Sequence, residues 1–197
     1  MQALVSVIMN CYNGEKYLKE AIDSVLNQTY TNWEIILWDN QSTDNTKGIV
    51  KRYNDDRIKY FYSKEFTILG EARSLALSKA KGKFIAFLDC DDLWFPTKLE
   101  KQILCFSNPD VGIVTCDTYF FNETKIVKQK YKYVKPIIGD AFKYLLLNAL
   151  SFETVVIRKS VLNKLDTYFD NRFTLIHDYD LIARISYISE LAYVDEV

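Results

Sequence analysis

Residues 83–94 read KFIAFLDCDDLW, an apolar run followed by three carboxylates within four positions. The apolar part, 83–88, has the length and composition of a buried strand. Clustered carboxylates repel one another and are costly to bury without a counter-charge. The stretch therefore predicts a buried strand whose carboxyl end carries either a cation site or a solvated acidic turn.

The spacing of the carboxylates favours the cation. In an extended segment alternate side chains point the same way, so Asp89 and Asp91 would share one face while Cys90 points to the other. Two hard oxygen donors on one face suit Mg²⁺ or Mn²⁺, which take few protein carboxylates and complete their shells with phosphate oxygens. The competing interpretation is an acidic turn in which Asp92 starts the next helix.

The composition indicates one globular domain. The chain has 197 residues, 49% of them hydrophobic, with six glycines and three prolines, which excludes a linker-rich or disordered architecture. Because 25 basic and 26 acidic residues nearly balance, the basic excess typical of nucleic-acid-binding proteins is missing, and we expect no nucleic-acid partner. The four cysteines lie far apart without a C-x-x-C pair, as is typical of buried free thiols in a reducing compartment, and disulfide pairing is the alternative.

Targeting and membrane signals are missing from the sequence. The chain begins almost directly with a strand-like segment, and its apolar runs fall short of the roughly 18–20 residues that cross a bilayer. We therefore expect a cytoplasmic protein without a transmembrane segment, for which peripheral contact with the inner face of the membrane stays open.

Strands and helices alternate through the first half of the chain. The expected strands are 4–9, 33–38, 58–62 and 83–88, and the expected helices are 16–26, 46–53, 71–81 (stopped by Gly82) and one opened by Pro96. This alternation predicts βαβ units and a mainly parallel sheet covered on both faces.

The second half has a mixed pattern. Its expected elements are two long hairpin strands at 111–121 and 125–134, a helix at 140–147, a strand at 154–158, a helix at 179–188 and a strand at 191–194. We therefore expect a single domain, 1–197, with a nucleotide-binding half over 1–110 and a mixed half over 111–197.

Polar clusters follow three of the expected parallel strands, at 10–13, 39–42 and 89–92. In open α/β sheets, ligands bind beyond the carboxyl ends of the strands. Asp39 can accept hydrogen bonds from the edge of a base, and Tyr12 offers a ring that packs against a planar heterocycle. The alternatives are turn chemistry for the Asn and Asp residues and core packing for Tyr12.

Two common phosphate-binding motifs do not occur. The absence of G-x-G-x-x-G and of G-x-x-x-x-G-K-[ST] argues against a dinucleotide-binding dehydrogenase and a P-loop protein. Phosphates would then be held by a metal and by side chains. Arg73 either pairs with a diphosphate oxygen through its guanidinium or lies on a solvated helix face.

The segment 176–184 carries the last candidate residues. Asp178 lies at or before the start of a helix, so it is either an N-cap or a general base that projects into a cleft. His177, the only histidine, adjusts that base, reaches the metal, or serves as a structural hydrogen-bonding residue. Asp180 and Arg184 are spaced as a local helix pair.

With these residues laid out, the chain resembles the family 2 glycosyltransferases of the GT-A fold. The matching pieces are VSVIMNCYNGEKYLKEAIDSVLNQTY (5–30), WEIILWDNQSTDNT (33–46), GEARSLALSKAKGKFIAFLDCDDLW (70–94), VVIRKSV (155–161) and HDYDLIARI (177–185). They follow the family's order and spacing across nearly the whole chain.

The resemblance implies an α/β fold of the nucleotide-diphospho-sugar transferases, with a mainly parallel central sheet and a mixed second half. It implies inverting, non-processive transfer of a sugar from a nucleoside diphosphate, UDP before others, to an acceptor hydroxyl, with Mn²⁺ or Mg²⁺. The resemblance also implies a role in cell-surface polysaccharide or glycolipid synthesis, with a saccharide or lipid-linked saccharide as the acceptor.

The resemblance also assigns roles by position. Asp39 would contact the nucleobase, Asp91 would ligate the metal with Asp89 near it and the ribose, and Asp178 would be the catalytic base. The full set expected at the donor is Asn10, Tyr12, Asp39, Arg73, Asp89, Cys90 and Asp91.

The sequence departs from the family pattern at three places. Asn10-Cys11 replaces the frequent Pro-Thr, Asp39-Asn40-Gln41-Ser42 replaces Asp-Asp-Gly-Ser, and His177-Asp178 replaces Glu-Asp. Q-x-x-R-W does not occur, which argues against a processive synthase, and the chain ends soon after the base region, where family members commonly continue. The remaining alternatives are a sugar nucleotidyltransferase, whose Gly-rich basic loop residues 10–14 do not provide, and a non-catalytic nucleotide-binding module.

Overall fold

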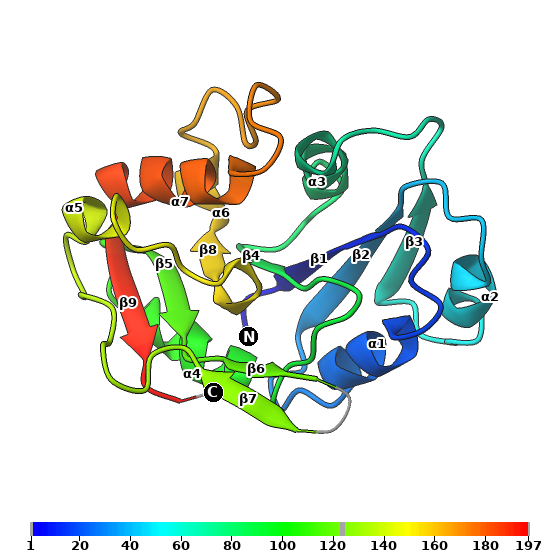
Figure 1. The fold of residues 1–197 in the computed structure, drawn as a ribbon, viewed down its shortest axis with the longest axis horizontal. Helices are drawn as coiled ribbons and strands as arrows, with labels where there is room; N and C mark the ends of the chain where they lie inside the picture. The colour runs from blue at the N-terminus through cyan, green and yellow to red at the C-terminus, as the bar shows by residue number, and fades with distance from the viewer. Residues whose placement is uncertain (1, 123–124, 197) are drawn as a thin grey trace.

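A seven-stranded sheet forms the centre of the computed structural model, which describes residues 2–122 and 125–196 (Figure 1). The strand order is β3-β2-β1-β4-β8-β5-β9. Strand β1 (Val5–Cys11) runs parallel to both β2 (Trp33–Asp39) and β4 (Phe84–Phe87), and β3 (Ile58–Tyr62) pairs in parallel with β2 at the edge. This half of the sheet confirms the parallel βαβ arrangement predicted from the alternation of elements.

The second half of the sheet is mixed, as predicted. The short strand β8 (Val156–Arg158) lies between β4 and β5 (Val111–Cys116) and is antiparallel to both. Strand β9 (Glu190–Val194) is parallel to β5 at the far edge.

Helices cover both faces of the sheet. They are α1 (Leu18–Leu26), α2 (Thr46–Val50), α3 (Leu69–Leu77), α4 (Lys98–Cys105), α5 (Phe142–Leu145), α6 (Lys159–Leu162) and α7 (His177–Ile188), with a 3-10 turn η1 (Phe152–Thr154). Strand residues alternate between two buried clusters: Ile8 packs with α3 and α7, and Val7 packs with α1 and α4. Among the described residues, no helix has the length and apolar character needed to cross a bilayer.

The long hairpin predicted over 111–134 is wrong. Residues 111–116 belong to the central sheet, and β6 (Tyr119–Phe121) and β7 (Ile126–Gln129) form a separate two-stranded sheet. Asp117 lies between the end of β5 and the start of β6. Its carboxylate accepts hydrogen bonds from the backbone N–H groups of Thr118 and Tyr131 at 2.8 and 2.9 Å, and these bonds interrupt the strand.

The helix predicted over 71–81 spans 69–77, so Gly82 does not end it. Gly82 has another reason to lack a side chain. A Cβ atom there would lie 2.6 Å from the backbone nitrogen of Ser6. The close approach of this turn to β1 therefore requires the glycine.

Candidate active site

The three polar segments predicted from the sequence gather at one edge of the sheet. Their strands are neighbours, since β1 pairs with β2 so that Cys11 lies opposite Asp39, and the backbone N–H of Leu88 after β4 donates to the carbonyl of Ile8 at 3.0 Å. The carboxyl ends of β1, β2 and β4 therefore form one site, as expected for an α/β sheet.

The loops after β1 and β2 are bonded to each other. Asn13, in the left-handed region at φ 55°, accepts a hydrogen bond from the backbone N–H of Thr43 at 2.8 Å, and its own N–H donates to Ser42 Oγ at 2.9 Å. The N–H of Gly14 donates to Thr46 Oγ1 at 3.0 Å. A Cβ atom at position 14 would lie 2.5 Å from Cys11 Sγ and 3.2 Å from Cys90 Sγ. The loops after β1 and β2 are thus packed tightly enough to require glycine at that position.

The deepest polar residue of this edge is Asp39, which is fully buried. One carboxylate oxygen accepts from the backbone N–H of Ser42 at 2.7 Å, and the other accepts from Tyr60 Oη at 2.5 Å. Burial and the Asp39 carboxylate raise the pKa of Tyr60, so the hydroxyl stays a donor. The turn chemistry considered for Asp39 is therefore present, and it fixes the carboxylate at the strand end.

The aromatic ring predicted to meet a base is exposed. Tyr12 is 53% exposed and packs edge-to-face on Phe66 with ring centroids 5.1 Å apart, so the core-packing interpretation of Tyr12 is wrong. Asn10, by contrast, is buried, and within the described part of the chain its Nδ2 has no hydrogen-bond partner.

Arg73 connects the two halves of the molecule. It is 3% exposed, and its Nη2 donates to both carboxylate oxygens of Asp89 at 3.0 and 3.1 Å, while Nη1 lies 3.0 Å from His177 Nε2. Its guanidinium carbon lies 4.6 Å from the ring centroid of Phe152. The interpretation of Arg73 as a solvated helix residue is therefore wrong.

His177 is neutral in this arrangement. Burial, and then the charge of Arg73, lower its pKa below the ordinary value. A guanidinium only donates hydrogen bonds, so His177 Nε2 accepts and the ring proton resides on Nδ1. His177 thus orients Arg73 at the start of α7, next to Asp178.

The acidic segment forms a turn. Strand β4 ends at Phe87, and the backbone N–H of Asp92 donates to the carbonyl of Asp89 at 3.2 Å. The extended geometry predicted to place Asp89 and Asp91 on one face is therefore wrong. Instead, Asp89, Asp92 and Glu153 each offer an oxygen within 4.8 Å of the others, and Asp91 is exposed outside this trio.

Arg73, which pairs with Asp89, compensates only part of the trio's negative charge. Burial, followed by the charges of Glu153, Asp89 and Asp91, raises the pKa of Asp92 to about 7. The pKa of Glu153 is also raised, by burial first and then by Asp89 and Asp178, against the opposing effect of Arg73. Hard oxygen donors that repel one another fit a divalent cation such as Mg²⁺ or Mn²⁺.

Sequence reasoning missed Asp92 as a cluster member and missed Glu153 altogether. Glu153 lies in η1, 61 positions after Asp92, and no local pattern marks it. Its only signal is its place three positions before the apolar strand β8, which pairs with β4 in the sheet.

Asp178 lies at the same site. It is the second residue of α7, and Ile176 occupies the N-cap position, so the N-cap interpretation of Asp178 is wrong. Its half-buried carboxylate accepts from the N–H of Tyr179 at 2.7 Å and contributes to the raised pKa of Glu153. The predicted pair of Asp180 and Arg184 is present at 2.7 Å, and Arg184 also donates to the carbonyls of residues 167 and 168.

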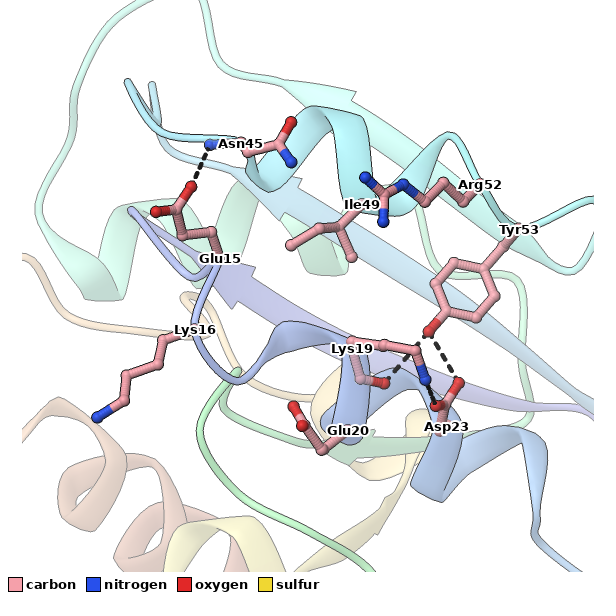
Figure 2. A pocket seen from close by; sticks show the side chains of 9 residues that line it. All are labelled: Glu15, Lys16, Lys19, Glu20, Asp23, Asn45, Ile49, Arg52 and Tyr53. Carbon is pink, nitrogen blue, oxygen red and sulfur yellow. Dashed lines mark hydrogen bonds and ion pairs between the residues drawn. The ribbon is translucent and has the colours of Figure 1, made fainter. Parts of the chain in front are cut away.

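A second depression, of about 800 Å³, lies between α1 and α2 (Figure 2). Several of its acidic groups are already bonded: Asp23 accepts from both Lys19 and Tyr53, and Glu15 accepts from the backbone N–H of Asn45. None of the predicted site residues lines this depression, so it is distinct from the candidate site.

The chain was compared with protein families and with known proteins. The sequence model of Glycosyl transferase family 2 matches residues 6–166. The Escherichia coli protein WfgD, a UDP-Glc:alpha-D-GlcNAc-diphosphoundecaprenol beta-1,3-glucosyltransferase, is 35% identical over 187 residues, 95% of this chain and 70% of WfgD. The putative glycosyltransferase EpsE of Bacillus subtilis (strain 168) is 49% identical over 102 residues, 50% of this chain and 37% of EpsE.

Solved structures share the fold. The crystal structure of S. aureus TarS 1-349 superposes with a TM-score of 0.82 at 24% identity, over 98% of this chain and 58% of that one. The mannosyltransferase PcManGT from Pyrobaculum calidifontis, in complex with GDP-Man and Mn²⁺, gives 0.77 at 21% identity over 100% of this chain and 56% of PcManGT. This chain therefore spans little more than half of either structure. The family match, the relatives and the shared GT-A architecture lead to one conclusion: the chain belongs to glycosyltransferase family 2.

Proposed function

We propose that this protein transfers a sugar from a nucleoside diphosphate, UDP before others, to an acceptor hydroxyl, with inversion at the anomeric carbon. The observation that best supports this is the position of Arg73. It bonds Asp89 on the donor side and His177 on the acceptor side, so the carboxylate trio and Asp178 are held in one site.

The donor base would lie beyond the ends of β1 and β2. There Asp39 is held rigid by Ser42 and Tyr60, and the exposed ring of Tyr12 offers a packing surface. Asn10, with an unused donor, and Cys90, in the acidic turn, complete the proposed donor site with Arg73, Asp89 and Asp91.

Asp89, Asp92 and Glu153 would hold a divalent cation, Mn²⁺ or Mg²⁺, and the predicted ligand Asp91 lies in the same turn. When bound, such an ion neutralises the charge that develops on a diphosphate leaving group. Arg73 keeps Asp89 oriented toward the other two carboxylates.

Asp178 is proposed as the general base. It takes the proton from the acceptor hydroxyl while the acceptor oxygen bonds to the anomeric carbon and the bond from that carbon to the diphosphate oxygen breaks. One displacement of this kind inverts the carbon and requires no nucleophile from the protein.

The acceptor is proposed to be a saccharide, in lipid-linked form, of a cell-surface polysaccharide or glycolipid pathway. The support is WfgD, whose name specifies a diphosphoundecaprenol acceptor. An acceptor of this kind implies a cytoplasmic enzyme in peripheral contact with the inner face of the membrane.

The test compares wild type with Asp178→Asn. Calorimetry with UDP and Mn²⁺ should give equal affinities for both proteins, while sugar transfer or donor hydrolysis should fall by about 10²-fold or more in the variant. Turnover at the wild-type rate in Asp178→Asn would refute the base. A non-catalytic module would bind UDP in both proteins and turn over in neither.

A further inference from the structure

The segment Lys125–Lys135, which we name the basic ribbon, has a charge unlike the rest of the chain. It reads KIVKQKYKYVK and carries five lysines and no acidic residue. The remainder of the chain has 20 basic and 26 acidic residues, since five of the 25 basic residues lie in the ribbon. A net charge of +5 is thus concentrated on one short surface segment of a molecule that is otherwise negative.

Large apolar side chains are interleaved with these lysines and exposed. Val127 is 61% exposed, Val134 68% and Tyr133 85%. Phe120 and Phe121 of β6, the strand paired with β7, are also about half exposed. Figure 1 shows β6 and β7 projecting from the central sheet beside the C-terminus. Exposed apolar patches of this kind mark interaction surfaces.

Three of the five lysines lack an acidic partner within the described ranges. Lys135 pairs with Asp195, and Lys130 is half-buried and donates to Ser151 Oγ at 3.1 Å. Lys125, Lys128 and Lys132 are exposed, and no carboxylate of residues 2–122 or 125–196 pairs with them. Their charge is available to a ligand outside the molecule.

The ribbon is close to the active site. A small pocket of about 90 Å³ is lined by Asp92 and Glu153 together with Tyr119 and Phe121 of β6. The ring of Tyr119 also packs edge-to-face on Phe95, just after the acidic turn, at 6.2 Å. A surface that docks on β6 and β7 is therefore brought next to the carboxylate trio.

We infer that the basic ribbon docks this enzyme on an anionic lipid surface. Lysines that alternate with exposed aromatic and branched apolar side chains fit the interface of a bilayer, where the charges meet phosphate headgroups and the apolar groups enter the acyl boundary. The net negative remainder of the chain is repelled by the same surface, which orients the ribbon toward it. The inference deepens the proposed function and rests on it in one respect, because it names the surface that would meet a lipid-linked acceptor.

Vesicle binding tests the inference without any turnover. Wild type should co-sediment with vesicles of phosphatidylcholine containing about one-third phosphatidylglycerol, and much less with phosphatidylcholine alone. Each lysine near the surface contributes roughly a fivefold gain in partitioning, so Lys125→Gln, Lys128→Gln and Lys132→Gln combined should lower binding by at least about tenfold. Tyr133→Ser with Val127→Ser should also weaken binding, and this loss should persist at high salt.

The matched control changes three exposed lysines elsewhere: Lys47→Gln, Lys51→Gln and Lys81→Gln. These remove the same charge and should leave binding near that of wild type. Equal binding of wild type to both kinds of vesicle, or equal losses in the two triple variants, would overturn the inference. Concentration-dependent dimer formation that the ribbon variants abolish, without vesicle binding, would assign the surface to a second copy and overturn it as well. UDP affinity and donor hydrolysis, measured without lipid, report on the proposed function separately.

Discussion

Arg73 Nη1 and His177 Nε2 lie 3.0 Å apart, although 104 positions separate the two residues in the chain. The same guanidinium holds Asp89 through its other nitrogen. The geometry of the site therefore depends on one buried guanidinium, which bonds the turn after β4 to the first residue of α7.

Replacement of Arg73 by methionine should destabilise the fold and weaken donor binding together. The change keeps the volume of the side chain but leaves Asp89 without its cation, and removing one partner of a buried ion pair costs about 3–5 kcal/mol, less here because Asp89 is half-buried. Urea unfolding measures the loss. Arg172→Met breaks an ion pair whose Arg172 side chain is 84% exposed and should leave the unfolding midpoint unchanged. Equal effects of the two variants would contradict the central role of Arg73.

Glu153→Gln should weaken Mn²⁺-dependent UDP binding by about tenfold or more, because it removes a charged ligand and keeps the shape of the side chain. Asp91→Asn tests the ligand predicted from the sequence in the same titration. Asp56→Asn, an exposed carboxylate outside the site, is the control and should bind as wild type does. If Glu153→Gln binds normally while Asp91→Asn does not, the metal is held by Asp89 and Asp91 instead.

Asp92→Asn should stabilise the metal-free protein more at pH 8 than at pH 5. The pKa of Asp92 is raised to about 7 in the fold, so the folded protein holds a proton that the unfolded chain releases near pH 4. Wild-type stability therefore falls as pH rises from about 4 to 7 and levels off above 7, whereas the neutral amide avoids that loss. Thermal melts of both proteins with a chelator at the two pH values measure the difference. If Asp92→Asn raised the melting temperature equally at pH 5 and pH 8, the raised pKa of Asp92 would be contradicted.

Gly14→Ala should destabilise the protein by about 1–3 kcal/mol, because its Cβ would lie 2.5 Å from Cys11 Sγ. Removal of that sulfur should restore space, so Cys11→Ala combined with Gly14→Ala is expected to be more stable than the sum of the single effects predicts. A double-mutant cycle by chemical denaturation gives this coupling. Strict additivity would show that the sulfur is not the obstacle.

Periodicity and spacing predicted the fold well where local pattern and tertiary context agree. Strands β1, β2 and β4 are buried on both faces, and their mostly apolar runs identify them. The hairpin at 111–134 could not be predicted correctly, because Asp117 ends one strand through bonds to residues near and distant in sequence.

The site residues that a local sequence pattern marks were predicted, and those placed by tertiary contacts were not. Asp39, Asp89 and Asp178 are recognisable because each follows or opens a patterned element. Glu153 is not, because a strand that enters the sheet between β4 and β5 brings it to the trio. The turn at 89–92 also departs from the extended geometry that alternation assumes, which moved Asp92 inward and left Asp91 exposed.

Because β8 is inserted between β4 and β5, the first half of the chain depends on the second half to complete its sheet. Strand β4 has β1 on one side and β8 on the other, and β8 arrives only 69 positions after β4 ends. A fragment that stops near residue 110 would leave the side of β4 that pairs with β8 as an open edge prone to association. Residues 1–110 are thus not a separable unit, because β8 from the second half of the chain completes their part of the sheet.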